Sequence, residues 1–98
     1  MSPPDPSPVI DLIEAFRRSK TMFAAVSLGV FEQLPGTAVE VAERIGAEAG
    51  AAARLLDGCA ALGFLRKEGG VYSNTAVAEH YLRAGSPHTL RGYIRYSD

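Results

Sequence analysis

Several residue types are scarce in this sequence, and each shortage narrows what the protein can be. The 98 residues include one cysteine and no tryptophan. A single cysteine excludes a disulfide framework and any metal site built from several cysteines. No run of about 18 apolar residues is present, so no segment resembles a membrane-spanning helix. A formal net charge of −1 leaves no excess of lysine and arginine, on which binding to a phosphate backbone mainly depends.

The composition is that of one small folded domain. At 47% apolar and 21% charged residues, the chain can bury a core that offsets the conformational entropy lost on folding. The first residues lack the basic and apolar stretches of a secretory signal peptide and are rich in proline instead. We therefore expect a flexible proline-rich tail over residues 1–8, one domain over residues 9–98, and a cytoplasmic location.

A long helix is predicted to follow the tail. Ser7 followed by Pro8 is typical of a helix start, with a capping side chain and a proline at the first helical position. Apolar residues then recur three or four positions apart as far as Val30, which is the spacing of one helix face. Gly29 is expected to end this helix. Apolar residues outside the main stripe make it wider than one shallow surface needs; these are Val9, Ile10, Ile13 and Met22.

The remaining pattern predicts a mostly α fold, a winged helix-turn-helix with extra N- and C-terminal helices. Thr37 and Glu40 form a capping box that starts a short helix, which Gly46 ends. A third helix is expected over residues 49–62. Residues 64–67 and 71–73 then form a two-stranded β-hairpin wing around Gly69-Gly70. A short helix through residue 82 and a last helix opening at Ser86-Pro87 complete the chain.

No catalytic, cofactor-binding or metal-binding residue emerges from this pattern. Cys59 falls on the inward stripe of the third helix, where a thiol is usually a small apolar side chain. His80 and His88 are eight positions apart and have no cysteine partner, which is not a zinc-ligand spacing. Asp11 and Glu14 are explained by their place near a helix start. Gly69-Gly70 opens a strand and not a helix, so it offers no phosphate cradle.

Two functions outside catalysis remain for such a domain. A DNA-binding transcriptional regulator would use the third helix to read bases, but its outer face offers one arginine, Arg54, beside Asp57 and small residues. An interaction module would use the first helix, which carries more apolar side chains than a domain of this size can cover. The interaction module is the preferred interpretation, and the regulator is the alternative.

The chain also resembles a known family. Its segments SKTMFAAVSLGVFEQL, TAVEVAERIG and ARLLDGCAALGFLRKEGGVYSNT are similar to the N-terminal dimerisation domain of class I S-adenosylmethionine-dependent O-methyltransferases. The relatives in question are the caffeate and acetylserotonin enzymes and bacterial natural-product enzymes. The resemblance covers residues 9–96. Its most specific parts are the motifs that begin at Ala25, Thr37, Leu55 and Tyr72.

The resemblance implies a division of labour between two domains. In that family the N-terminal helices of two subunits intertwine into a homodimer and help to wall the partner's acceptor pocket. A following Rossmann-like domain binds S-adenosylmethionine and carries a histidine base. This chain lacks that second domain, and His80 and His88 precede the place where its histidine would stand. The resemblance thus implies a fragment that is not catalytic by itself, from a parent enzyme that methylates a small hydroxylated acceptor.

Four residues of the first helix are the candidates for the dimer and substrate-wall surface. They are chosen from the apolar stripe together with the use that the family makes of this region, and they are Phe16, Met22, Phe23 and Val26. S-adenosylmethionine is expected as a cofactor of the parent protein only. Neither nucleic acid nor a membrane is expected as a partner.

Overall fold

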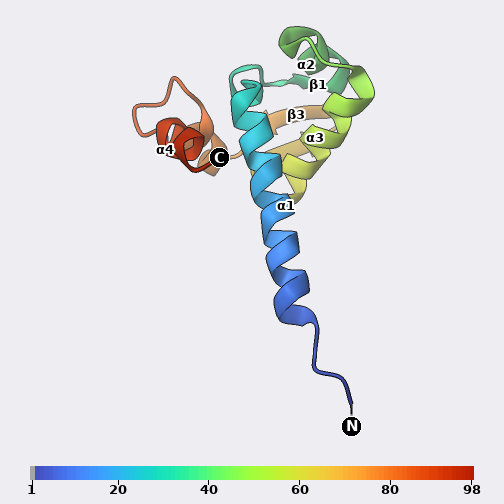
Figure 1. Ribbon diagram of the computed structural model, residues 1–98. Coiled ribbons are helices and arrows are strands. Elements are labelled where there is room, and N and C mark those ends of the chain that lie inside the picture. The colour runs from blue at the N-terminus through green and yellow to red at the C-terminus, as the bar shows by residue number, and fades with distance from the viewer. Residues whose placement is uncertain (1) are drawn as a thin grey trace.

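The computed structural model describes residues 2–98 and shows one long helix with a small α/β body packed at its C-terminal end. Helix α1 spans Ser7–Ser27, and Figure 1 shows its first half extending beyond the body. This projection makes the molecule 55 Å long but only 29 × 23 Å in cross-section. Residues 2–6 hold no helix or strand, and α1 begins at Ser7 with Pro6 before it.

Local sequence signals set the ends of the first three helices. Gly29 has a φ of 72°, a left-handed conformation that ends α1, and the short helix η1 follows over Val30–Glu32. Helix α2 spans Ala38–Ile45 and begins with the predicted capping box. In that box the Thr37 hydroxyl accepts from the Glu40 amide and the Glu40 carboxylate accepts from the Thr37 amide. Helix α3 spans Ala49–Ala61.

The wing has one strand more than the sequence analysis expects. Strands β2 (Leu65–Glu68) and β3 (Val71–Asn74) form the predicted antiparallel hairpin. A two-residue strand β1 (Gly36–Thr37) pairs with the free edge of β3, so the sheet order is β1-β3-β2. Two residues are too few to show an alternating pattern, which is why the sequence gives no sign of β1. The predicted mostly helical class with a small antiparallel sheet is confirmed, and the element order is consistent with a winged helix.

The C-terminal part differs from the expectation in where its helices begin. A π-helical turn, η2, covers Ala78–Leu82, and α4 spans Arg91–Ser97. The prediction that Ser86-Pro87 opens the last helix is wrong. The Ser86 hydroxyl instead donates to the His80 carbonyl oxygen at 2.6 Å, so this serine closes the loop between η2 and α4. Helix α4 packs against α1 on the side away from the sheet (Figure 1).

The core lies where the C-terminal half of α1 meets α3, η1 and the sheet. Its largest fully buried side chains come from four different elements, and they are Val30, Phe31, Val41, Leu56, Cys59 and Tyr72. Ala25 and Val26 are the buried residues that α1 contributes. No helix within residues 2–98 is long and apolar enough to cross a membrane. The buried residues of α1 lie near its C-terminal end, so the first half of this helix stays outside the core.

Candidate functional site

An apolar stripe on the projecting half of α1 is the most prominent surface feature of the chain. Val9, Leu12, Ile13 and Phe16 recur at helical spacing and so share one side of α1; we refer to them as the α1 stripe. Leu12 is 73% exposed and Phe16 is 63% exposed. Exposed apolar side chains that are contiguous mark an interaction surface, whereas scattered ones do not. The α1 stripe is thus the candidate interaction surface of the described chain.

The four residues that the sequence analysis selects differ in how far they are buried. Phe16 belongs to the exposed α1 stripe. Met22 and Phe23 are half-buried and pack against the core, and Val26 is 3% exposed and forms part of it. The sequence analysis assigned Val9 and Ile13 to the excess apolar surface of this helix without selecting them as site residues. Their spacing from Phe16 is the signal that could have found them.

A cation continues the α1 stripe toward α4. The Lys20 ammonium lies 5.9 Å from the ring centroids of both Phe16 and Phe23. It also donates to the Asp98 carboxylate at the end of α4, at 3.0 Å. Lys20 can hold both rings and the carboxylate because its ammonium has three donors on a flexible stem. Phe16, Lys20 and Phe23 thus form a continuous edge that joins the α1 stripe to α4.

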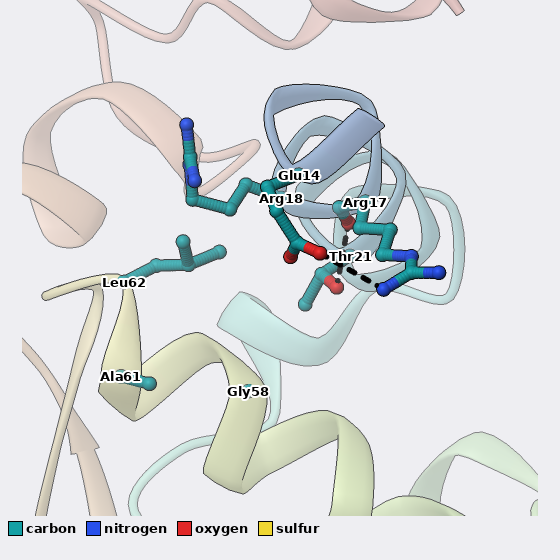
Figure 2. A pocket seen from close by; sticks show the side chains of 7 residues that line it. All are labelled: Glu14, Arg17, Arg18, Thr21, Gly58, Ala61 and Leu62. Atoms are coloured by element: carbon teal, nitrogen blue, oxygen red, sulfur yellow. Dashed lines mark hydrogen bonds and ion pairs between the residues drawn. The ribbon is translucent and has the colours of Figure 1, made fainter. Parts of the chain in front are cut away.

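A groove lies between α1 and α3 on another side of the long helix. The groove has a volume of about 340 Å³. Figure 2 shows the side chains that line it, which are Glu14, Arg17, Arg18 and Thr21 of α1 with Gly58, Ala61 and Leu62. Glu14 accepts from Arg17 at 2.9 Å, and the Thr21 hydroxyl donates to the Arg17 carbonyl oxygen at 3.1 Å. These contacts tie the polar groups to one another within a turn of the helix. The groove brings together no nucleophile and base.

Cys59, His80 and His88 are the residues that the sequence analysis weighs as a nucleophile or as metal ligands. Cys59 is fully buried, and burial raises the pKa of its thiol to about 11, which keeps it protonated and unreactive. His80 and His88 stack with ring centroids 4.4 Å apart on the surface. Across residues 2–98, no group of three or more histidine, cysteine, aspartate or glutamate side chains could hold a metal ion. Within the described residues, Cys59, His80 and His88 thus do not come together as one group.

The turn at Gly69-Gly70 does not have the form of a glycine-rich binding turn for S-adenosylmethionine. Dinucleotide and nucleoside sites of the Rossmann type place a glycine-rich turn between a parallel strand and a helix N-terminus. Here Gly69 and Gly70 instead form the turn between two antiparallel strands, β2 and β3. Both have positive φ values, which the tight hairpin turn itself requires.

A polar cluster fastens the wing to α3. The Tyr72 hydroxyl and the Lys67 ammonium both donate to the Asp57 carboxylate, the lysine at 3.1 Å. Lys67 also lies 5.1 Å from the centroid of the Tyr72 ring. The hydrogen bond from Tyr72, followed by that from Lys67, holds the pKa of Asp57 below its ordinary value of 3.8. Because Lys67 is paired within the chain, one of the two cations of strand β2 is not free for a phosphate backbone.

We expect Asp57→Asn to reduce the dependence of stability on acidic pH. The pKa of Asp57 is lowered in the folded chain, so its stabilisation is complete above the ordinary value and is lost as pH falls through the folded value. Urea unfolding midpoints measured between about pH 5 and about pH 2.5 should fall less in the variant than in the parent chain. The control is Asp11→Asn, because Asp11 makes no hydrogen bond or ion pair elsewhere in residues 2–98. Equal acid sensitivity of the parent and Asp57→Asn would contradict the assignment.

Comparisons with known proteins place this fold in a family. Residues 10–84 match the model of the O-methyltransferase dimerisation domain. The chain is 40% identical, over 92% of its length, to 3-hydroxy-5-methyl-1-naphthoate 3-O-methyltransferase from Streptomyces sahachiroi. Its fold superimposes with a TM-score of 0.87 on an O-methyltransferase family protein from Burkholderia thailandensis, at 33% identity over 98% of the chain. The TM-score is 0.83 with human N-acetylserotonin methyltransferase in complex with SAM, at 32% identity and 98% coverage.

The chain is much shorter than these relatives. It spans 27% of the Streptomyces enzyme, 30% of the Burkholderia protein and 31% of the human one. The family model and the relatives give no support to the DNA-binding alternative. The matched residues contain the C-terminal half of α1, the capping box of α2, all of α3 and the wing, together with most of the α1 stripe. This chain belongs to the O-methyltransferase dimerisation domain family.

Proposed function

We propose that this chain joins to a second copy of itself through the α1 stripe and so holds together two subunits of an S-adenosylmethionine-dependent O-methyltransferase. The observation that carries the proposal is the stripe itself, four exposed apolar side chains on a helix half that extends beyond the body (Figure 1). A stripe of this kind is stabilised when a partner removes it from water. The family to which the chain belongs supplies the kind of partner, because its domains serve dimerisation.

A second role follows for the edge where the α1 stripe meets α4. Phe16, Met22 and Phe23 would wall the acceptor pocket of the partner subunit, with the buried Val26 holding the helix in place beneath them. Aromatic side chains and a methionine suit a flat, apolar acceptor that carries a hydroxyl group. The relatives support this class of substrate, since their names include a naphthoate O-methyltransferase and an acetylserotonin O-methyltransferase.

In this proposal the described residues bind and position, and they do not transfer the methyl group. S-adenosylmethionine would supply the methyl group on another part of the longer protein, since the described glycines do not form a site for it. The structures of human N-acetylserotonin methyltransferase with SAM and of PigF with SAH support this cofactor for the parent protein. The role left to this chain is to fix two subunits in register so that one subunit can complete the other's pocket.

Sedimentation equilibrium of the 98-residue chain tests the proposed association. We expect a single equilibrium between monomer and dimer, with the dimer predominant at micromolar concentrations. A chain that stays near its monomer mass of 10.4 kDa at the highest soluble concentration would contradict the proposal. An irregular series of larger species would also contradict it, because a closed two-fold interface stops at the dimer.

We expect the isolated chain to bind no S-adenosylmethionine. The physical reason is the absence, within residues 2–98, of a glycine-rich turn that opens onto a helix N-terminus. Isothermal titration with the cofactor should give only the heat of dilution. Apolar aromatic acceptors serve as a second titrant, and they should also bind weakly, since the proposed pocket needs the rest of the protein. Saturable micromolar binding of the cofactor would show that the domain has a site of its own.

A further inference from the structure

The α1 stripe has an internal symmetry that the proposed association does not by itself require. Its four residues are separated by three positions, then one, then three, so the spacing is the same in both chain directions. We infer that two copies of α1 pair antiparallel, about a two-fold axis that passes between Leu12 and Ile13. This inference rests on the proposed self-association and adds the orientation and register of the two helices.

The antiparallel register matches the stripe with itself. It places Val9 opposite Phe16 of the partner subunit and Leu12 opposite Ile13 of the partner subunit, and the two-fold axis repeats each contact. A large ring then faces a small side chain at both ends of the contact, so the distance between the helices stays even. A parallel pair would instead oppose two Phe16 rings at one end and two Val9 side chains at the other. Even packing along a helix seam favours the antiparallel pair.

Charge along α1 points to the same orientation. The acidic residue on the N-terminal side of the stripe is Asp5, just before the helix, whereas Lys20 follows the stripe on the same side of α1. The antiparallel register brings the start of one helix, which Asp5 precedes, toward Lys20 of the partner subunit, while a parallel pair places the two Lys20 side chains at the same level. The helix dipoles also oppose each other in an antiparallel pair. Opposite charges brought close together set the orientation of an interface.

Two carboxylates lie at one level in this register, but they do not repel each other across the interface. Asp11 and Glu14 share a level in the antiparallel pair, but helical geometry turns both of them away from the stripe side of α1. Glu14 lines the groove against α3 and is paired with Arg17 (Figure 2). Neither carboxylate therefore faces the partner helix.

The body of the molecule leaves room for this pairing. In the chosen register the helices overlap from residue 7 to residue 18, about 18 Å at 1.5 Å per residue. This range is the projecting half of α1, where the residues on the stripe side are exposed. The start of the partner's helix then lies near Lys20, Phe23 and Asp98, the edge at which α1 meets α4. Each copy thereby covers the edge that the other leaves exposed.

Cysteine cross-linking of the full 98-residue chain tests the register. The variants are V9C alone, F16C alone, and an equal mixture of the two, with mild oxidation after subunit exchange at concentrations where sedimentation shows the dimer. The native Cys59 is fully buried and does not interfere. A disulfide requires Cα atoms within about 7 Å, whereas like positions at Val9 or Phe16 would lie roughly 10 Å apart along antiparallel helices. We expect the mixture to cross-link at least about tenfold faster than either variant alone.

The variant L12C is the matched control, because position 12 lies beside the two-fold axis and should cross-link to itself. Rapid self-cross-linking of V9C and of F16C, with no gain in the mixture, would show parallel helices and overturn the inference while leaving the association intact. A dimer in which none of the variants cross-links, L12C included, would place the interface elsewhere and also overturn it. A chain that is monomeric by sedimentation would overturn the inference together with the proposed function.

Discussion

The double variant L12D/F16D is expected to be a monomer at concentrations where the parent chain is a dimer. Leu12 is the most exposed residue of the α1 stripe at 73%, and Phe16 is its largest side chain, 63% exposed. Burying such a side chain contributes about 1.5–3 kcal/mol, and the two-fold interface buries each residue twice. Because roughly two thirds of each side chain is exposed before association, the loss is about 4 kcal/mol or more, which raises the dimer dissociation constant at least roughly a thousandfold. Sedimentation equilibrium over a wide concentration range measures this change.

The control for this variant is V39D. Val39 is 57% exposed on α2, so it carries a comparable apolar surface at a place that the α1 stripe does not reach. We expect V39D to dimerise like the parent chain. Circular dichroism of L12D/F16D should retain most of the helical signal, because the body of the domain is packed without the projecting half of α1. A double variant that remains dimeric, or a control that is equally disrupted, would rule out the α1 stripe as the interface.

The parts of the fold that the sequence predicts are those fixed by local chemistry. The capping box at Thr37 and Glu40 satisfies two backbone amides by itself, and it starts α2 at the expected residue. Gly29 and Gly46 take left-handed conformations at the ends of their helices, as expected from the absence of a side chain. The hairpin turn at Gly69-Gly70 follows the same logic. None of these features depends on what lies far away in the sequence.

The parts that the sequence does not predict depend on distant contacts. Strand β1 exists because residues 36 and 37 meet the free edge of β3, more than thirty positions later. Ser7 and Ser86 carry the same signal, a serine followed by proline, but neither side chain caps a helix: the Ser7 hydroxyl donates to the Asp5 carboxylate and the Ser86 hydroxyl donates to the His80 carbonyl oxygen. The partner of such a serine is decided by the acceptors that the folded chain brings near it.

The candidate site likewise has one part that the local sequence predicts and one part that depends on distant contacts. Periodicity correctly indicates that α1 has more apolar residues than the domain can cover, but it cannot say which of them the body covers. Val26 is in the core and Phe16 is exposed, although both lie on the apolar side of the same helix. The difference arises because the side chains that α1 contributes to the core all lie in its second half. The position at which a long helix leaves its domain is a tertiary property and has no local signal.

Two phenylalanines of this chain should separate folding from association. Phe31 is 1% exposed in the core beside α1, and its carbonyl oxygen accepts from the Asn74 amide of β3 at 2.9 Å. Replacing it with alanine leaves a cavity among side chains that cannot collapse fully, which costs about 3–5 kcal/mol. That is a large share of the roughly 5–15 kcal/mol by which domains are stable. We expect F31A to lower the melting temperature by more than about 10 °C.

F16A is the matched variant, the same substitution at an exposed position of the same chain. Below the dimer dissociation constant, where unfolding reports on the monomer alone, F16A should melt within a few degrees of the parent because its side chain already contacts water. Above that concentration it should weaken the dimer, whereas F31A should lose dimer only as far as it unfolds. If F16A destabilised the monomer as much as F31A, the projecting half of α1 would be part of the folding unit. The α1 stripe would then serve the core and not a partner.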